Sequence, residues 1–329
     1  MAQRAANEPN EDDTPLNKAA FKGNLDLVQY LISQGAEVIK SGNDGLTPLH
    51  YASITGYIDV VKYLIRQGAE VDQGEHDGQT PLHFASRNGH LDVVKYLIGR
   101  GAEVNKSDNS GQKAPLHFAS RNGHLDVVKY LISRGAEVNK GDNDGQTPLH
   151  FASRNGHLGV VKYLISQGAR VNKGDNDGQT PLHFASRNRH LDVLKYLISQ
   201  GARVNKGDND GQTPLHYASI SGHLDVVRYL ISHGAEVNKG DNNGMAPLHC
   251  ASINNRLDIV KYLISQGAQI DQHNDKGVTA LHYAKLSSHR DIVQYLRSEQ
   301  ARRKEPSPEG TVKPGLTKPD FKSKFHFSF

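Results

Sequence analysis

Histidine is the residue type that offers this chain the most chemistry, since 18 of its 329 residues are histidines. Imidazole binds transition metals and titrates near neutral pH, so a metal site or acid–base catalysis has to be considered. Thirteen of these histidines recur at two fixed positions of a repeating sequence. They are His50, His83, His117, His150, His183, His216, His249 and His282 at the first position, and His90, His124, His157, His190 and His223 at the second. A catalytic or metal centre is normally a unique set of residues, so this repetition favours a structural role.

Other chemical motifs are missing from the sequence. Cys250 is the only cysteine, which excludes an intrachain disulfide and a zinc site built from cysteine pairs. Neither H-E-x-x-H nor the phosphate-binding pattern G-x-x-x-x-G-K-[S/T] occurs. We therefore expect no catalytic residues, no bound metal and no cofactor, and we expect that the protein is not an enzyme.

The elements that position the histidines follow from the tetrapeptide Thr-Pro-Leu-His and its close variants. The spacing of its copies is 33 residues, except for one interval of 34, where Lys113 is taken as an insertion. The copies begin at Thr14, Thr47, Thr80, Ala114, Thr147, Thr180, Thr213, Ala246 and Thr279. Self-similarity at a fixed period indicates a tandem-repeat protein.

One unit predicts two helices and an extended connection. Thr80 is a good N-cap, and Pro81 suits the first position of a helix. Gly89 can end this helix in a left-handed conformation, and Gly101 can end the second helix in the same way. The second helix carries one wide apolar stripe, formed by Leu91, Val93, Val94, Leu97 and Ile98. Because neither helix can bury its apolar residues alone, we expect the units to stack into one elongated core.

This pattern divides the chain into three parts. Residues 13–300 form the array of nine repeats, with the first and last as polar caps. Residues 1–12 are expected to be a disordered acidic segment, and residues 301–329 a disordered basic tail that contains prolines. The fold class is therefore all-α, a solenoid with a disordered C-terminal tail.

The repeated pattern G-x-T-P-L-H-x-A, G-H-x-x-V-V, L-I and G-A-x-V-N resembles the ankyrin repeat family. The resemblance covers residues 14–299 in nine copies. It implies a left-handed superhelix whose concave face is made by the first helices and the hairpin tips. It also implies that this face recognises other proteins, and that the histidines form hydrogen bonds within and between units. A monomeric scaffold or adaptor is the function this resemblance favours.

Some residues depart from the pattern. Arg189 stands where the first helix normally ends in glycine, and a left-handed conformation there costs about 1 kcal/mol. Asn255 occupies the same place two repeats later and tolerates that conformation better. Gly159 replaces an aspartate and leaves Lys162 without the expected helical partner.

Charge argues against nucleic acid as the partner. The formal net charge is +4, and the whole excess lies in residues 301–329. The second helices carry a cationic stripe that we expect to be solvated and paired with aspartate three residues earlier, on the convex face. It consists of Lys62, Lys95, Lys129, Lys162, Lys195, Arg228 and Lys261. No run of apolar residues is long enough to span a membrane, and no secretory signal is recognised, so we expect a cytoplasmic protein, with the nucleus as the alternative.

Differences between repeats point to a binding site. The residue two before the first-helix glycine is arginine in the middle repeats, namely Arg87, Arg121, Arg154 and Arg187, and apolar in the flanking ones, namely Ile54, Ile220 and Ile253. The residue before the motif threonine is a glutamine at Gln79, Gln146, Gln179 and Gln212. Two interpretations follow: each arginine is solvated or paired with an aspartate, or the row binds an extended acidic segment with apolar anchors at its ends.

Two other classes of function stay open. Ankyrin-like arrays are substrates of asparaginyl hydroxylases, and the positions that fit best are Asn105, Asn139 and Asn238. The length of the array and its basic tail also suit a mechanical or membrane-tethering linker.

Overall fold

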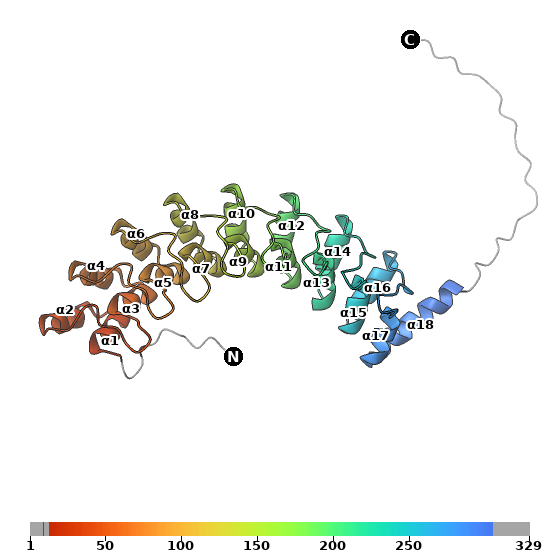
Figure 1. Ribbon diagram of the computed structural model, residues 1–329, viewed down its shortest axis with the longest axis horizontal. Coiled ribbons are helices and arrows are strands. Elements are labelled where there is room, and N and C mark those ends of the chain that lie inside the picture. The colour runs from red at the N-terminus through yellow and green to blue at the C-terminus, as the bar shows by residue number, and fades with distance from the viewer. Residues whose placement is uncertain (1–8, 10–12, 305–329) are drawn as a thin grey trace, which may run out of the picture.

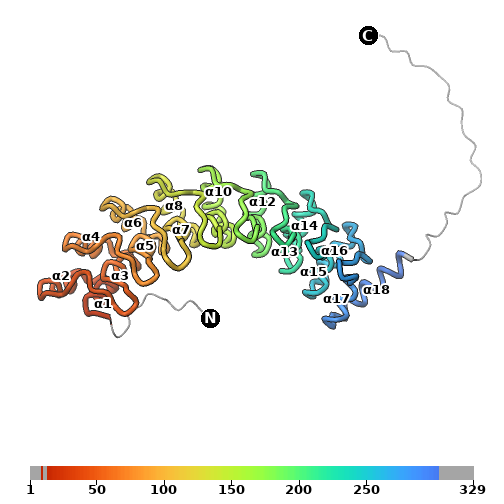
Figure 2. The backbone as a smooth tube through the Cα atoms, viewed as in Figure 1, coloured from red at the N-terminus to blue at the C-terminus, as the bar shows by residue number. Residues whose placement is uncertain are grey.

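The structure is a computed structural model that describes residue 9 and residues 13–304. It forms a single arc of helix pairs, with the odd-numbered helices along the inner side and the even-numbered helices along the outer side (Figure 1). Figure 2 traces the same path from the first repeat to the last. In the described part of the chain, the only extended pairing is an isolated bridge between His273 and Thr279. The predicted all-α solenoid is confirmed.

Each repeat contributes one inner and one outer helix. The inner helices are α1 (Pro15–Phe21), α3 (Pro48–Thr55), α5 (Pro81–Asn88), α7 (Pro115–Asn122), α9 (Pro148–Arg154), α11 (Pro181–Arg187), α13 (Pro214–Ser221), α15 (Pro247–Ile253) and α17 (Ala280–Leu286). The outer helices are α2 (Leu25–Ser33), α4 (Ile58–Arg66), α6 (Leu91–Gly99), α8 (Leu125–Ser133), α10 (Leu158–Ser166), α12 (Leu191–Ser199), α14 (Leu224–Ser232), α16 (Leu257–Ser265) and α18 (Arg290–Lys304).

Local chemistry sets where the inner helices begin and end. Before α5, the backbone N–H of Thr80 donates to Nδ1 of His83, and the Thr80 hydroxyl lies 2.9 Å from the same nitrogen. At its end, Gly89 has φ of +79°, which favours glycine. A Cβ there would also lie 2.5 Å from Nδ1 of His124 in the next repeat. This glycine is therefore required by its backbone conformation and by the close approach of the neighbouring unit.

One continuous core runs through the array. The predicted stripe of α6 is buried, with Val93, Val94 and Leu97 at most 1 % exposed. Small Ala85 is fully buried where α5 packs against its neighbours α3 and α7. Each repeat therefore depends on the two beside it for most of its burial, as expected of a solenoid.

The first repeat leaves an apolar surface open. Leu27 is 39 % exposed, although Val60, at the same position one repeat later, is 1 % exposed. Asn17, which stands at the motif-histidine position of the first repeat, is buried and donates a hydrogen bond to the carbonyl of Leu46. It replaces the repeat histidine structurally, because an amide can also reach the next hairpin.

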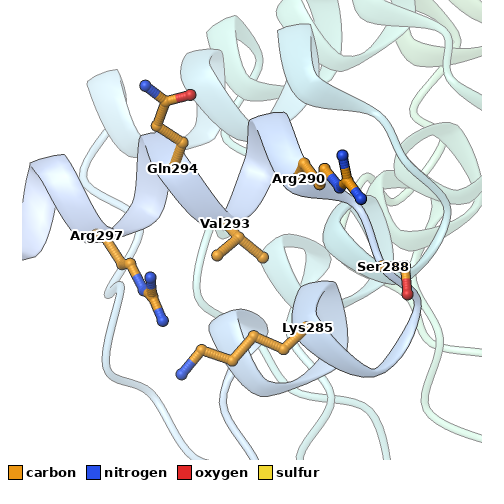
Figure 3. A pocket seen from close by; sticks show the side chains of 6 residues that line it. All are labelled: Lys285, Ser288, Arg290, Val293, Gln294 and Arg297. Atoms are coloured by element: carbon orange, nitrogen blue, oxygen red, sulfur yellow. The ribbon is translucent and has the colours of Figure 1, made fainter.

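The last repeat ends in cations instead. Lys285, Arg290 and Arg297 surround Val293 along a hollow of about 480 Å³ (Figure 3). The lysine and the second arginine extend toward the same side of this valine (Figure 3). At the registers of the three cations, the preceding repeat carries Ser252, Leu257 and Ile264. Charged groups replace surface that a further repeat would bury.

The insertion lies elsewhere than expected. Lys113 occupies the register of Gln146, because its carbonyl accepts a hydrogen bond from His83 and one from the backbone of Asp108. The extra residue lies earlier in the turn, where Gln112 adopts a φ of +52° at a position that is glycine in other hairpins. Assigning the insertion to Lys113 was wrong, since sequence spacing alone does not locate an extra residue within a turn.

The described residues also test the predicted turn at Arg189 and the predicted end of the array. Arg189 has φ of +61°, which confirms the left-handed turn, and Asn255 follows it with +57°. Helix α18 continues to residue 304, four residues past the predicted boundary at 300. Residues 305–329 of the predicted tail, and most of the predicted N-terminal segment, lie outside the described residues. Among the helices described, none combines the length and apolar character needed to cross a bilayer.

Candidate functional site: the concave face

The motif histidines join neighbouring repeats. Nδ1 of His83 accepts a hydrogen bond from the backbone N–H of Thr80 at 3.0 Å. Its Nε2 lies 3.1 Å from the carbonyl of Lys113 in the next hairpin. Because a carbonyl only accepts, Nε2 must carry the proton and the ring is neutral.

Burial keeps these rings neutral. It lowers the pKa to about 4 at His50, His83, His150 and His183. It also lowers the pKa of His117, His216 and His249. The second set of histidines contacts the preceding repeat, as Nε2 of His90 lies 2.9 Å from the carbonyl oxygen of Ile54. Across residues 13–304, no three histidine, cysteine or acidic side chains cluster as metal ligands would.

Two of the four arginines are held in a network between repeats. Arg87 donates to Oε1 of Gln79 at 2.5 Å, and its guanidinium carbon lies 4.3 Å from the ring centre of Phe118 in the next repeat. Gln79 in turn donates to the buried carboxylate of Asp108. Gln79 therefore connects helix α5, the hairpin that precedes it and the hairpin of the next repeat.

Arg154 repeats this arrangement. It donates to Oε1 of Gln146 at 2.9 Å and lies 4.2 Å from the ring centre of Phe184. Gln146 donates to Asp175, as Gln79 does to Asp108. Each of these guanidiniums uses one of its five N–H donors in the hydrogen bond to glutamine.

Arg187 is held differently, because tyrosine replaces phenylalanine in the next repeat. Its guanidinium lies 4.2 Å from the ring centre of Tyr217, and the Tyr217 hydroxyl donates to Asp208 at 2.6 Å. Oε1 of Gln179, the glutamine of this repeat, is buried with no hydrogen-bond partner. Gln212 is half-buried. The glutamines therefore differ in role although the sequence repeats them.

Arg121 stands apart from the other three. Its repeat has Lys113 in place of glutamine, and this lysine forms an ion pair with the buried Asp142 at 3.3 Å. Arg121 is exposed, whereas Arg87, Arg154 and Arg187 are half-buried. In the described part of the chain it has no glutamine, carboxylate or aromatic partner. It is the exposed arginine of the row, so a ligand can reach it without displacing another side chain.

The four arginines form one electrostatic surface. Burial lowers the pKa of Arg87, and the charge of Arg121 lowers it further. Burial likewise lowers the pKa of Arg154, with further contributions from Arg187 and Arg121. The arginines therefore repel one another. Nearby carboxylates offset part of this repulsion, namely Asp108, Glu75, Asp142 and Asp175.

The apolar flanks are unequal. Ile54, expected to be an anchor site, is only 7 % exposed because it packs into the core, so it offers a ligand little apolar surface. Ile220 is half-buried, while Ile253 is 39 % exposed and Leu286 is 79 % exposed. Accessible apolar surface therefore lies on the C-terminal side of the arginine row.

Acidic hairpin tips border the same face. Asp77, Asp144, Asp177 and Asp210 are all exposed. At the second and third repeats, Glu75 and Asp77 line a hollow of about 210 Å³ together with Phe84 and Arg87. The repeat of Arg121 has Ser110 and Gly111 in its tip. The centre of the concave face is therefore its most cationic part.

The candidate hydroxylation residues belong to a ladder between repeats. The amide of Asn105 donates to the carbonyl of Gly135 at 2.9 Å, and its oxygen accepts from the backbone of Glu137 at 3.0 Å. Asn139 and Asn238 make the same pair of hydrogen bonds, as do Asn172 and Asn205. Hydroxylation stays a prediction, and reaction there would first require this ladder to open.

The convex lysines are less self-paired than expected. Among the seven, ion pairs to aspartate join Lys62 to Asp59 and Lys129 to Asp126. Four others lie over a tyrosine ring of the next repeat, at 4.5 to 5.8 Å, namely Lys162, Lys195, Arg228 and Lys261. The periodic tyrosines could have signalled these contacts. Sequence reasoning also missed the aromatic residues that contact the inner histidines edge-to-face and lie under the arginines, namely Phe84, Phe118, Phe151, Phe184 and Tyr217.

Fold and site together define a helical tandem-repeat protein with a charged concave face. A family model that describes three consecutive ankyrin repeats matches the chain in overlapping stretches. These are residues 2–75, 67–142, 116–208, 171–241, 200–274 and 235–305. The chain belongs to the ankyrin repeat family, whose repeats are generally protein–protein interaction modules. A comparison with curated proteins finds no match.

Proposed function

We propose that the protein is a non-catalytic scaffold or adaptor, a monomer of the cytoplasm or nucleus, whose concave face binds an extended acidic segment of a partner protein. The exposed Arg121 carries this proposal, because it stands among three other arginines and has no partner of its own in residues 13–304. A carboxylate from a ligand can take both of its paired donors, as arginine–carboxylate contacts commonly do.

The other arginines contribute positive electrostatic potential rather than direct contacts with the ligand. Arg87 and Arg154 are engaged with glutamine and aromatic rings, so a ligand need not order them on binding. Side chains that are already fixed cost less entropy when they bind. A long row of one charge also speeds association with a segment of opposite charge.

The matched test compares two cations of one repeat. Arg121→Glu should weaken binding of a fluorescent Asp/Ser peptide about tenfold, near 1.4 kcal/mol, and make it less sensitive to salt. Lys129→Glu, on α8 of the outer face, should leave the affinity within about twofold, because exposed pairs contribute little. Fluorescence anisotropy gives both values, and circular dichroism checks folding. Weaker binding through Lys129 rather than Arg121 would place the site on the outer face.

A further inference from the structure

The spacing of the concave side chains restricts the shape of the ligand, an inference that rests on the proposed function. Each held arginine lies between two aromatic rings of consecutive repeats. The Arg87 guanidinium carbon is 5.1 Å from the ring centre of Phe84 and 4.3 Å from that of Phe118. For Arg154 the corresponding distances are 5.7 Å to Phe151 and 4.2 Å to Phe184.

These contacts hold consecutive rings to about 10 Å or less, in line with the 8–10 Å between packed helices. The next pair obeys the same limit, because Arg187 lies 5.9 Å from Phe184 and 4.2 Å from Tyr217. Because the arginines occupy equivalent positions on adjacent inner helices, we take their interval as one repeat, about 8–10 Å where helices pack side by side.

Few backbone conformations return a side chain to the same face at that interval. A polyproline II helix does so every third residue, after about 9.3 Å. A β-strand does so after about 6.6 Å or 13 Å. An α-helix returns to the same face after about 10.5 Å, at every seventh residue. The difference between this distance and the repeat interval adds up over four repeats.

The hairpin tips restrict the remaining positions. Asp77, Asp144 and Asp177 are exposed along the edge of the same face, and Asp77 shares a hollow with Arg87. Carboxylates in excess of those that face the arginines would find no cation and would be repelled by these tips. The surface thus favours a neutral ligand backbone with acids at one interval rather than uniform negative charge.

We propose that the concave face binds a segment in polyproline II conformation with an acidic residue at every third position, one of these carboxylates being bound by Arg121. Four successive acids would then lie opposite repeats 3 to 6, over about 30 Å or nine to ten residues, with the direct ion pair at Arg121 and the other three acids in the field of the held arginines. The half-buried Ile220 and the exposed Ile253 lie beyond this row, so an apolar residue is expected at one end of the segment, next to repeat 7.

Three labelled peptides of about twelve residues test this with the full chain. The first repeats Asp-Pro-Pro, the second has the same composition with its aspartates grouped at one end, and the third alternates Asp with Thr. The first should bind at least tenfold more tightly than either of the others in fluorescence anisotropy. The Arg121→Glu variant should abolish this preference, and Lys129→Glu should keep it.

The outcomes separate the two proposals. Equal affinity for all three peptides, with all sensitive to Arg121→Glu, would overturn the polyproline register and leave acidic docking intact. Tightest binding of the alternating peptide would overturn it in favour of a strand. Failure of every peptide to bind would overturn the register together with the proposed function.

Discussion

Repeats 3–6 and repeats 7–9 use the same concave position in opposite ways. In the former, Arg87 and Arg154 are fixed by glutamine, by aromatic rings and through them by an aspartate of the next hairpin. In the latter, Ile253 and Leu286 extend from the equivalent position into solvent. One region presents charged side chains linked between units, and the other presents exposed apolar side chains. Identical repeat geometry thus supports two kinds of contact.

Acid should destabilise the repeats whose motif histidine is buried far more than the last repeat. His50, His83, His150 and His183 bind protons near pH 4 when folded and near 6.5 when unfolded, so the unfolded chain holds more protons between these values. The free energy of unfolding should therefore fall as pH drops from 6.5 to 4, by about 3 kcal/mol for each histidine. Urea unfolding at several pH values measures it.

Hydrogen exchange at pH 5 locates the effect. Repeats 2–8, whose motif histidines are buried, should lose protection before the last repeat, whose His282 is exposed. His150→Asn should flatten the pH dependence, since Asn17 already makes the equivalent contact without a titratable group. A stability that stays constant from pH 7 to pH 5 would contradict neutral, buried rings.

Removing an aromatic ring should harm only the linked region. Phe184 is 2 % exposed and contacts both Arg154 and Arg187, so Phe184→Ala should cost about 3–5 kcal/mol. Leu286→Ala, at a side chain 79 % exposed, should change stability by less than about 0.5 kcal/mol. Chemical denaturation of both variants gives the comparison, and similar losses would mean that the two regions are packed alike.

Two glutamines of adjacent repeats test the network itself. Gln146→Ala removes hydrogen bonds to Arg154 and Asp175 and should cost about 1 kcal/mol. Gln179→Ala removes a side chain whose buried oxygen has no partner, so it should cost less or nothing. Thermal unfolding of the pair measures the difference. The reverse order would show that Arg154 does not depend on its glutamine.

The junction of the regions gives the smallest effect. Arg189→Gly relieves a left-handed arginine, worth about 1 kcal/mol, but loses an exposed ion pair to Asp225 worth about 0–1 kcal/mol. The net gain should stay below about 1 kcal/mol. Asn255→Gly should gain less, because asparagine tolerates this conformation better. Unchanged hydrogen-exchange rates over residues 180–201 in the Arg189→Gly variant would argue against strain at this turn.

Local sequence rules determined most of the fold. The Thr-Pro pair, the helix-ending glycines and the stripe through Val93 and Leu97 act within a few residues, and each repeat states them again. That redundancy predicted the solenoid, the two helices of each unit and the left-handed turn at Arg189. The row of four arginines was predicted for the same reason, since repeat register alone places them at equivalent points.

Only the tertiary structure decided what those positions do. Packing between repeats buried Ile54, exposed Ile253, and bound Arg87 to a glutamine while leaving Arg121 open. None of this is visible in the register, because it depends on which side chain the adjacent repeat presents at the point of contact. A repeat sequence fixes where each side chain starts, whereas burial and hydrogen bonding are properties of two repeats together.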